Sequence, residues 1–316
     1  MAMPTTADIR PRPRRASVLA AVLTATALAA TTAGAAATAS PAAAGAAART
    51  AARTGTAAAA AAAKPTVVLV HGAFADGSSW DAVIRRLQRD GYHVIAPANP
   101  LRGLPGDSAY IASVLRTIRG PIVLVGHSYG GAVISNAAFG NTQVKALVYI
   151  AALVPDEGEV LSVLSAKFPG SQLNAALTST PFTKPDGTTA TQLSIRPDRF
   201  RAVFAAGIPA VTTAVLAATQ RPISASAFAD KAGPAAWKTI PSWTLVATRD
   251  RTIAPALERF EARRAHSHTI EVDSPHLAMI ARPEAVTRLI LTAARSGATT
   301  PGAVRVGRMG PPKKIG

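Results

Sequence analysis

The sequence predicts an α/β fold in which a mainly parallel sheet is covered by helices on both faces. Two observations support this prediction. Apolar runs of strand length alternate along the chain with segments in which apolar residues recur at helical spacing. The apolar run at residues 122–125 also leads directly into a Gly-His-Ser-Tyr-Gly motif centred on Ser128, and a helical pattern follows at once. A strand, a sharp turn with serine at its apex and a helix are the local structure that presents a serine nucleophile.

The elements before this motif follow from short local signals. Residues 66–71 are an almost continuous apolar run, which is typical of a strand buried on both faces. From Trp80 to Leu87 the apolar residues are spaced as on one face of a helix, and Gly91 ends the pattern. The alternation then continues with a strand at 92–97, a helix at 107–119 and the strand at 122–127.

The elements after the motif repeat the alternation with one interruption. Further strands are expected at residues 144–151, 243–248 and 269–272, and further helices at residues 255–265 and 283–294. Between these strands lies a region without a convincing strand pattern, in which prolines separate short helical segments. We therefore expect a core formed by residues 65–154 and 241–294, and a helical cap formed by residues 155–240 over one edge of the sheet.

Low-complexity segments flank the predicted core. Arginines between Arg10 and Arg15 precede an apolar run at residues 17–30 and a series of small residues, which is typical of an export signal within residues 1–40. Because the run is short for a membrane span, we expect cleavage rather than a transmembrane anchor. The expected product is a secreted or extracytoplasmic protein with no stable membrane span. Residues 41–64 are interpreted as an Ala-rich linker, and residues 295–316 as a basic, disordered tail.

Charge and composition exclude several classes of protein. The formal net charge is +17, but residues 1–64 contribute +6 of it and residues 295–316 contribute +5. Acidic and basic residues are mixed in between, without a basic face that carries aromatic residues, so no nucleic-acid binding is expected. The chain has no cysteine, no histidine pair at metal-ligand spacing and no phosphate-binding loop. We therefore expect neither a metal nor a cofactor.

The serine of the motif needs a base, and the base needs an orienting carboxylate. His276 follows the last predicted strand, at the carboxyl edge where the sites of open parallel sheets lie, so it is the expected base. Asp250 ends the preceding strand and is the expected acid, which gives the chain order Ser128, Asp250, His276. Asp107 and Asp273 are the alternative acids, although the first lies on an early loop and the second just before the histidine.

Two backbone N–H groups are needed to hold the oxyanion that forms when a serine attacks a carbonyl group. Tyr129, directly after the nucleophile, is expected to supply one of them. Ala73 is expected to supply the other from the loop after the first strand, with Phe74 as the second choice, because Gly72 lets this loop pass close to Ser128. Apolar side chains are expected to line a substrate pocket under the cap: Phe74, Phe168, Phe182, Phe200, Phe204 and Leu277.

Five segments between residues 65 and 294 together resemble the α/β-hydrolase superfamily. They are VVLVHGAFADGSSW, VGHSYGGAVI, VKALVYIAA, WTLVATRDRTI and SPHLAMIARPEAV. More narrowly, they resemble the branch that holds small cap-bearing carboxylesterases, plant methyl-esterases and hydroxynitrile lyases. The resemblance implies the α/β-hydrolase fold and the same five site residues, namely Ser128, Asp250 and His276 as triad with Ala73 and Tyr129 as oxyanion donors.

Departures from the family pattern help to choose within this branch. The lyases carry a threonine after the first-strand histidine and a lysine after the catalytic histidine, where this chain has Gly72 and Leu277. Arg249 stands where the family often has a glutamate, which alters the local charge. The resemblance therefore implies a serine hydrolase that cleaves a small apolar carboxylic ester through an acyl-enzyme intermediate. The alternatives are a cofactor-free perhydrolase or haloperoxidase-like enzyme, and a non-catalytic small-ligand-binding protein of the same fold.

Overall fold

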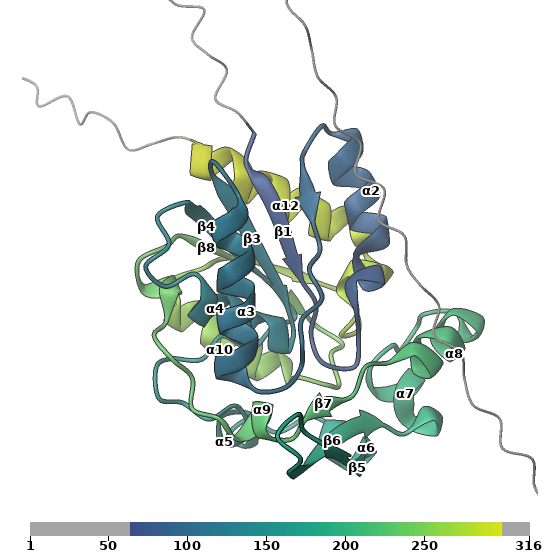
Figure 1. Cartoon of the computed structure of the whole chain (residues 1–316). Helices are drawn as coiled ribbons and strands as arrows, with labels where there is room; N and C mark the ends of the chain where they lie inside the picture. The colour runs from purple at the N-terminus through teal and green to yellow at the C-terminus, as the bar shows by residue number, and fades with distance from the viewer. Residues whose placement is uncertain (1–63, 299–316) are drawn as a thin grey trace, which may run out of the picture. The chain divides into compact units, whose positions relative to one another are not determined.

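A six-stranded parallel sheet forms the centre of the computed structural model, which describes residues 64–298 (Figure 1). The strand order is β2-β1-β3-β4-β8-β9, and every neighbouring pair is parallel. Its strands are β1 (Thr66–Val70), β2 (Val94–Ile95), β3 (Ile122–His127), β4 (Val144–Ile150), β8 (Ser242–Ala247) and β9 (His268–Val272). The predicted parallel α/β fold is therefore confirmed, although β2 is shorter than the sequence pattern indicates.

Helices cover both faces of this sheet. On one face α2 packs against α12, and on the other face α3 packs against α4 (Figure 1). Parallel strands need such crossover connections, and the covered faces explain why β3 and β8 are buried at every position. The bounds of the core helices are η1 (Gly77–Trp80), α2 (Asp81–Arg89), α3 (Leu104–Thr117), α4 (Tyr129–Ala137), α10 (Pro255–Arg264), α11 (Ala278–Ala281) and α12 (Pro283–Ala298).

The region between β4 and β8 forms the cap. Its helices are α5 (Leu161–Ala166), α6 (Leu173–Ala176), α7 (Pro197–Val203), α8 (Ala210–Thr219), α9 (Ser226–Ala229) and η2 (Ala236–Lys238). It also contains a three-stranded antiparallel sheet, with strands β5 (Leu177–Thr183), β6 (Thr189–Ile195) and β7 (Ile223–Ser224). The prediction of a purely helical cap is therefore wrong.

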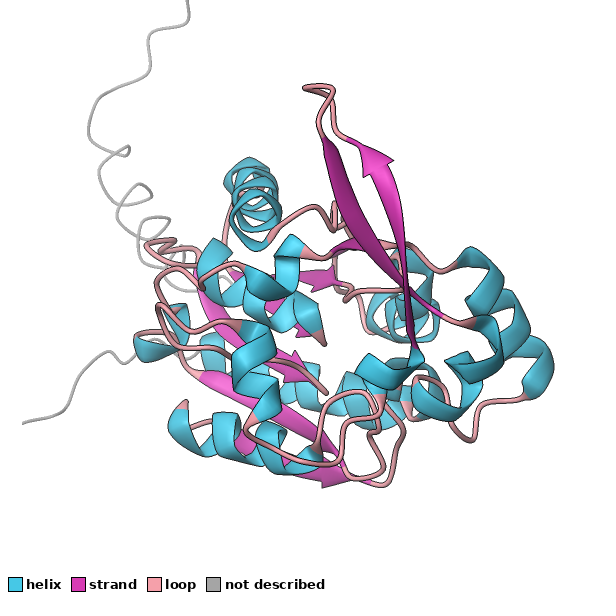
Figure 2. Ribbon diagram, turned by 90° about the horizontal axis from the view of Figure 1, so that it is seen from below, coloured by secondary structure: helices cyan, strands magenta, loops and turns pink. Residues whose placement is uncertain are grey.

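The strands of the cap were missed because they lack the apolar pattern of a buried strand. Figure 2 shows the β5–β6 hairpin projecting away from the rest of the domain, and most positions of β5 are exposed. Pro181 argued against a strand, but β5 lies at the edge of its sheet, where proline is tolerated. The turn had a readable signal, because Pro185-Asp186-Gly187 is a typical turn sequence and the Gly187 N–H donates to the Lys184 carbonyl at 2.9 Å.

Several sequence predictions fall on the chain ends. The export signal (1–40) and nearly all of the linker (41–64) lie outside the described residues, as does the end of the basic tail. The tail prediction is corrected at its start, because α12 continues to Ala298. Within residues 64–298 no helix has both the length and the apolar character needed to cross a membrane.

Candidate active site

Ser128 occupies a strained turn between β3 and α4. Its φ of 53° and ψ of −127° are a backbone conformation that residues with side chains rarely adopt. The turn is tight enough to require glycine on both sides. A Cβ on Gly126 would lie 2.6 Å from the Gly130 carbonyl oxygen, and a Cβ on Gly130 would lie 2.6 Å from the Val70 carbonyl oxygen. The glycines of the motif therefore allow β1, β3 and α4 to pack closely around the serine.

Asp250 and His276 meet behind the carboxyl ends of β8 and β9. His276 Nδ1 donates to Asp250 Oδ2 at 2.5 Å, and both side chains are fully buried. The other carboxylate oxygen of Asp250 accepts the backbone N–H groups of Thr252, at 2.6 Å, and Ile253, at 2.9 Å. These two bonds fix the carboxylate, and the carboxylate fixes the imidazole ring. The Nε2 atom of His276, which a nucleophile would need, has no partner among the described residues.

His127, next to the serine, ties the nucleophile turn to the histidine loop. Its Nε2 lies 3.1 Å from the His276 carbonyl oxygen, and the two rings are 4.6 Å apart between centroids. Because the partner is a carbonyl group, Nε2 carries the hydrogen and donates it. Burial, with His276 as a second cause, holds the pKa of His127 well below 6.5, so the ring is neutral. The sequence interpretation gave His127 no role, because its partner lies far along the chain.

The loop after β1 passes directly beside the serine. A Cβ on Gly72 would lie 2.6 Å from the Ser128 Cβ, so this glycine permits the close approach that an oxyanion donor in the loop requires. His71 braces the loop: its Nε2 accepts the Asn99 backbone N–H at 2.9 Å, so Nδ1–H donates to the Gly72 carbonyl at 2.9 Å. Burial lowers the pKa of His71 to about 4, which keeps this tautomer neutral. Ala73, the expected donor, follows in the same loop and lines a cavity together with Ser128.

The alternative acids have other partners. Asp107 is buried on α3, where it accepts the Tyr129 hydroxyl at 2.8 Å and the Arg102 backbone N–H at 3.0 Å. It therefore supports the residue after Ser128, and burial raises the pKa of the Asp107 carboxyl. Asp273 is exposed and pairs with Arg249, which gives the unusual arginine at position 249 a partner on the surface.

A cavity of about 350 Å³ opens above Ser128, between the core and the cap. Ser128 and Ala73 belong to its wall, and Phe74 and Phe168 line it as predicted. Within the described part of the chain no charged side chain contributes to the wall, and the polar groups are hydroxyls and the Asn174 amide. Apolar side chains that the sequence interpretation missed also line it: Leu153, Leu173, Leu177, Leu193, Phe228 and Ile253.

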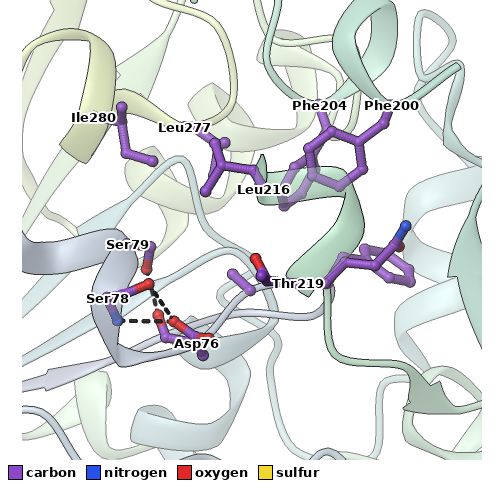
Figure 3. A pocket seen from close by; sticks show the side chains of 12 residues that line it. Asp76, Ser78, Ser79, Phe200, Phe204, Leu216, Thr219, Leu277 and Ile280 are labelled. Carbon is purple, nitrogen blue, oxygen red and sulfur yellow. Dashed lines mark hydrogen bonds between the residues drawn. The ribbon is translucent and has the colours of Figure 1, made fainter. Parts of the chain in front are cut away.

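Four predicted pocket residues lie elsewhere. Phe182 lies on the exposed hairpin, 4.6 Å below the Arg102 guanidinium. Phe200, Phe204 and Leu277 line a separate hollow of about 10 Å³, which holds no more than about one water molecule (Figure 3). Phe204 nevertheless contacts the site, since its ring packs 5.0 Å from the ring of His276. The predictions for Phe200 and Phe204 failed because aromatic residues in and directly after a short helix do not indicate which side of it faces a cavity.

Acidic side chains and histidines do not gather into a metal site in the described chain. Within residues 64–298 no cluster of three or more His, Asp or Glu side chains could hold a metal ion.

Comparisons with known proteins identify a family and two relatives that match part of the chain. A family model described as an alpha/beta hydrolase family matches residues 67–289. A carbendazim-hydrolyzing esterase from Nocardioides sp. (strain SG-4G) is 33% identical over 113 residues, and the match covers 32% of this chain and 47% of the relative. A pyrethroid hydrolase from Sphingobium wenxiniae is 35% identical over 106 residues, and the match covers 29% of this chain and 37% of the relative. The matched segments thus span about half of the first relative and less of the second.

Solved structures extend the likeness over the whole fold. The crystal structure of polyneuridine aldehyde esterase superposes with a TM-score of 0.63 at 16% sequence identity. The superposition covers 72% of this chain and 98% of the esterase. This chain therefore shares its fold with a protein of the small esterase-like branch that the sequence motifs resemble.

Proposed function

The chain belongs to the α/β-hydrolase family, and on this premise we propose that it is a serine esterase. In this proposal it cleaves neutral, largely apolar carboxylic esters through an acyl-enzyme intermediate. Ser128 is the nucleophile, His276 the general base and Asp250 the residue that orients it.

The observation that carries this proposal is the buried hydrogen bond from His276 Nδ1 to Asp250 Oδ2. It places the imidazole proton on Nδ1 and leaves the unpaired Nε2 as the basic nitrogen. Ser128 follows β3 at the same carboxyl edge of the sheet, in a strained turn and at the N-terminus of α4. A helix N-terminus favours the negative charge that develops in acyl transfer.

The reaction then has two steps. His276 takes the Ser128 proton while Oγ attacks the ester carbonyl, and the N–H groups of Ala73 and Tyr129 hold the oxyanion. Collapse of the tetrahedral intermediate transfers the proton from His276 to the leaving alcohol. Water, activated by His276, then attacks the acyl-enzyme and returns Ser128 with its proton.

The cavity supports a substrate without charge. None of the described residues that line it carries an ionised side chain, and an uncompensated charge in an apolar cavity costs on the order of several kcal/mol. A volume of about 350 Å³ is suitable for a small molecule with an apolar acyl or alcohol group. The names of the two relatives, a carbendazim-hydrolyzing esterase and a pyrethroid hydrolase, support the proposal that this chain hydrolyses such esters.

A panel of p-nitrophenyl esters with increasing acyl length tests the proposal. We expect turnover by the wild type and a loss of about 10³-fold or more in kcat for Ser128→Ala. Ser162→Ala, which changes another serine of the cavity wall, is the matched control and should keep kcat. A fluorophosphonate probe should add one adduct at Ser128. Labelling that persists in Ser128→Ala, or ligand binding without turnover of any ester, would contradict the proposal.

A further inference from the structure

A second carboxyl group lies buried beside Asp250. Glu258 is on the first turns of α10, which begins directly after the Asp250 loop, and only 1% of the residue is exposed. Its Oε2 accepts the backbone N–H of Ala247, the last residue of β8, at 3.0 Å. The side chain is therefore fixed to the strand that carries Asp250.

No described group donates a hydrogen bond to the other oxygen of Glu258, Oε1, which is buried. Asp250 is held at the same strand end, since its backbone N–H donates to the Ala247 carbonyl at 3.1 Å. Among the ionisable groups that act on Glu258, Asp250 has the largest effect, followed by the acidic Glu261, whereas the cation Arg259 acts only weakly. Its neighbour Arg259 is directed to the surface, where it binds Glu271 in a bidentate pair.

Two carboxyl groups that are neighbours in a buried site cannot both be ionised at neutral pH. Burial, with the Asp250 charge as the second cause, raises the pKa of Glu258 well above its ordinary value of 4.5. Asp250 has stronger support for a negative charge, because it accepts two backbone N–H groups and the His276 ring. The single proton of the pair therefore belongs to Glu258.

We propose that Glu258 is a positioning residue that acts as a neutral carboxylic acid and donates its O–H group to the carboxylate of Asp250. This inference rests on the triad proposed above and extends it by one member, in the order Glu258, Asp250, His276, Ser128. Both oxygens of Glu258 then have partners: Oε2 accepts from Ala247, and Oε1 donates to Asp250.

The donated bond sets the strength of the base. It disperses the charge on Asp250 and so limits how strongly Asp250 stabilises a protonated His276. Loss of the donor would stabilise the protonated imidazole, because the imidazolium would face a more concentrated negative charge. An ionised Glu258 would stabilise it further. Glu258 thus preserves His276 as a base that can accept the serine proton.

Two variants separate the donated hydrogen bond from a simple packing role. Glu258→Gln keeps the acceptor for Ala247 and supplies an amide N–H for Asp250, so kcat should stay within about threefold of the wild type and the acid limb of the kcat/KM profile should not move. Glu258→Leu removes the donor, so kcat should fall about 10- to 100-fold at little change in KM, and the acid limb should move to higher pH. Glu261→Gln, on the same helix but bound to Val154, is the matched control and should leave the profile unchanged.

The protonation state has a direct spectroscopic test. The infrared spectrum of the wild type near pH 6 should contain the C=O stretch of a protonated carboxyl group that shifts in D₂O and is absent from Glu258→Gln. Absence of this band from the difference spectrum overturns the proposal. It is also overturned if Glu258→Gln moves the acid limb to lower pH, since this is the effect of removing a negative charge, or if both Glu258 variants lose the same activity.

The infrared result does not depend on the reaction. A wild type that turns over no ester would refute the proposed function, and the carboxyl band would still decide whether Glu258 carries the proton. Conversely, an active enzyme without the band would keep the proposed function and refute the role of Glu258.

Discussion

The core and the cap of this protein are built in opposite ways. β3, at the centre of the core, is buried at each of its six positions, whereas in β5 of the cap only Leu177 and Phe182 are partly buried. Polar side chains in the core site are held by several bonds each, as Asp250 is by Thr252, Ile253 and His276. The cap instead contributes mainly apolar walls and hydroxyl groups to the cavity. If the proposed function is correct, the core determines the reaction and the cap determines which molecule reaches Ser128.

The largest effect is expected from the base in the core. His276→Ala should lower kcat by about 10³-fold or more with KM little changed, because it removes the group that takes the serine proton. His93→Ala, at an exposed histidine, is the control and should keep kcat. Steady-state kinetics on one p-nitrophenyl ester measures both. An active His276→Ala would show that the chemistry does not reside in the core.

Substitutions of two glycines test whether the core is packed more tightly than the cap. Gly130→Ala should cost more than about 3 kcal/mol of unfolding free energy or prevent folding, because its Cβ would meet the Val70 and His71 carbonyl groups. Gly187→Ala, in the cap hairpin, should cost only about 1 kcal/mol, because φ is 81° but no atom lies within 4 Å of the added Cβ. Urea denaturation measures both. An equal loss of unfolding free energy in the two variants would contradict the idea that the core is more tightly packed than the cap hairpin.

Glu261 lies where the chain leaves the core for the cap, and it should make stability depend on pH. Its carboxyl accepts the Val154 N–H at 2.9 Å, and burial raises its pKa from 4.5 to about 8. The folded protein therefore keeps a proton that the unfolded chain releases above pH 4.5. The resulting stabilisation is complete below pH 4.5 and is lost as the pH rises to 8, with a slope of at most about 1.4 kcal/mol per pH unit.

The measurement compares the unfolding free energy of the wild type and Glu261→Gln between pH 5 and pH 8. The difference between the two proteins should shift steadily in favour of the variant as the pH rises. A constant difference would show that Glu261 is already ionised at pH 5, which would contradict a buried neutral carboxyl at the junction.

The smallest effect is expected from the cap wall. Leu193→Phe narrows the cavity, so it should raise KM for long acyl esters by about tenfold while kcat for the acetate ester stays unchanged. Thr191→Phe, at an exposed position of the same strand, adds the same ring outside the cavity and serves as the control. If Leu193→Phe lowered kcat equally for every ester, the cap would act on the chemistry and the proposed division between the regions would fail.

Much of the core could be predicted because its signals are local. The apolar runs of β1 and β3 predict strands that are buried on both faces, and the Gly-His-Ser-Tyr-Gly motif predicts the turn. The position of Asp250 and His276 after successive strands indicates that they share one edge of the sheet, and the structure places them in contact. The triad itself stays a prediction until Ser128 is tested.

The cap could be predicted only in outline. Its extent follows from the gap between two strands, but most residues of the hairpin are polar, so its sequence resembles that of a loop. Phe200 and Phe204 were expected in the cavity and instead pack on each other beside His276. Leu193 lines the cavity from a strand that was not predicted at all.

The sequence by itself determined the parallel α/β core, the serine turn and the order of the site residues, because strand burial and turn geometry depend on neighbours along the chain. Only the tertiary structure decided which cap side chains line the cavity with Ser128, that His127 holds the loop of His276, and that Glu258 is bound to the end of β8. These are contacts between side chains that separate elements bring together. The energies of these contacts depend on how deeply the side chains are buried and on which polar groups are left without a hydrogen bond. A local sequence pattern indicates neither.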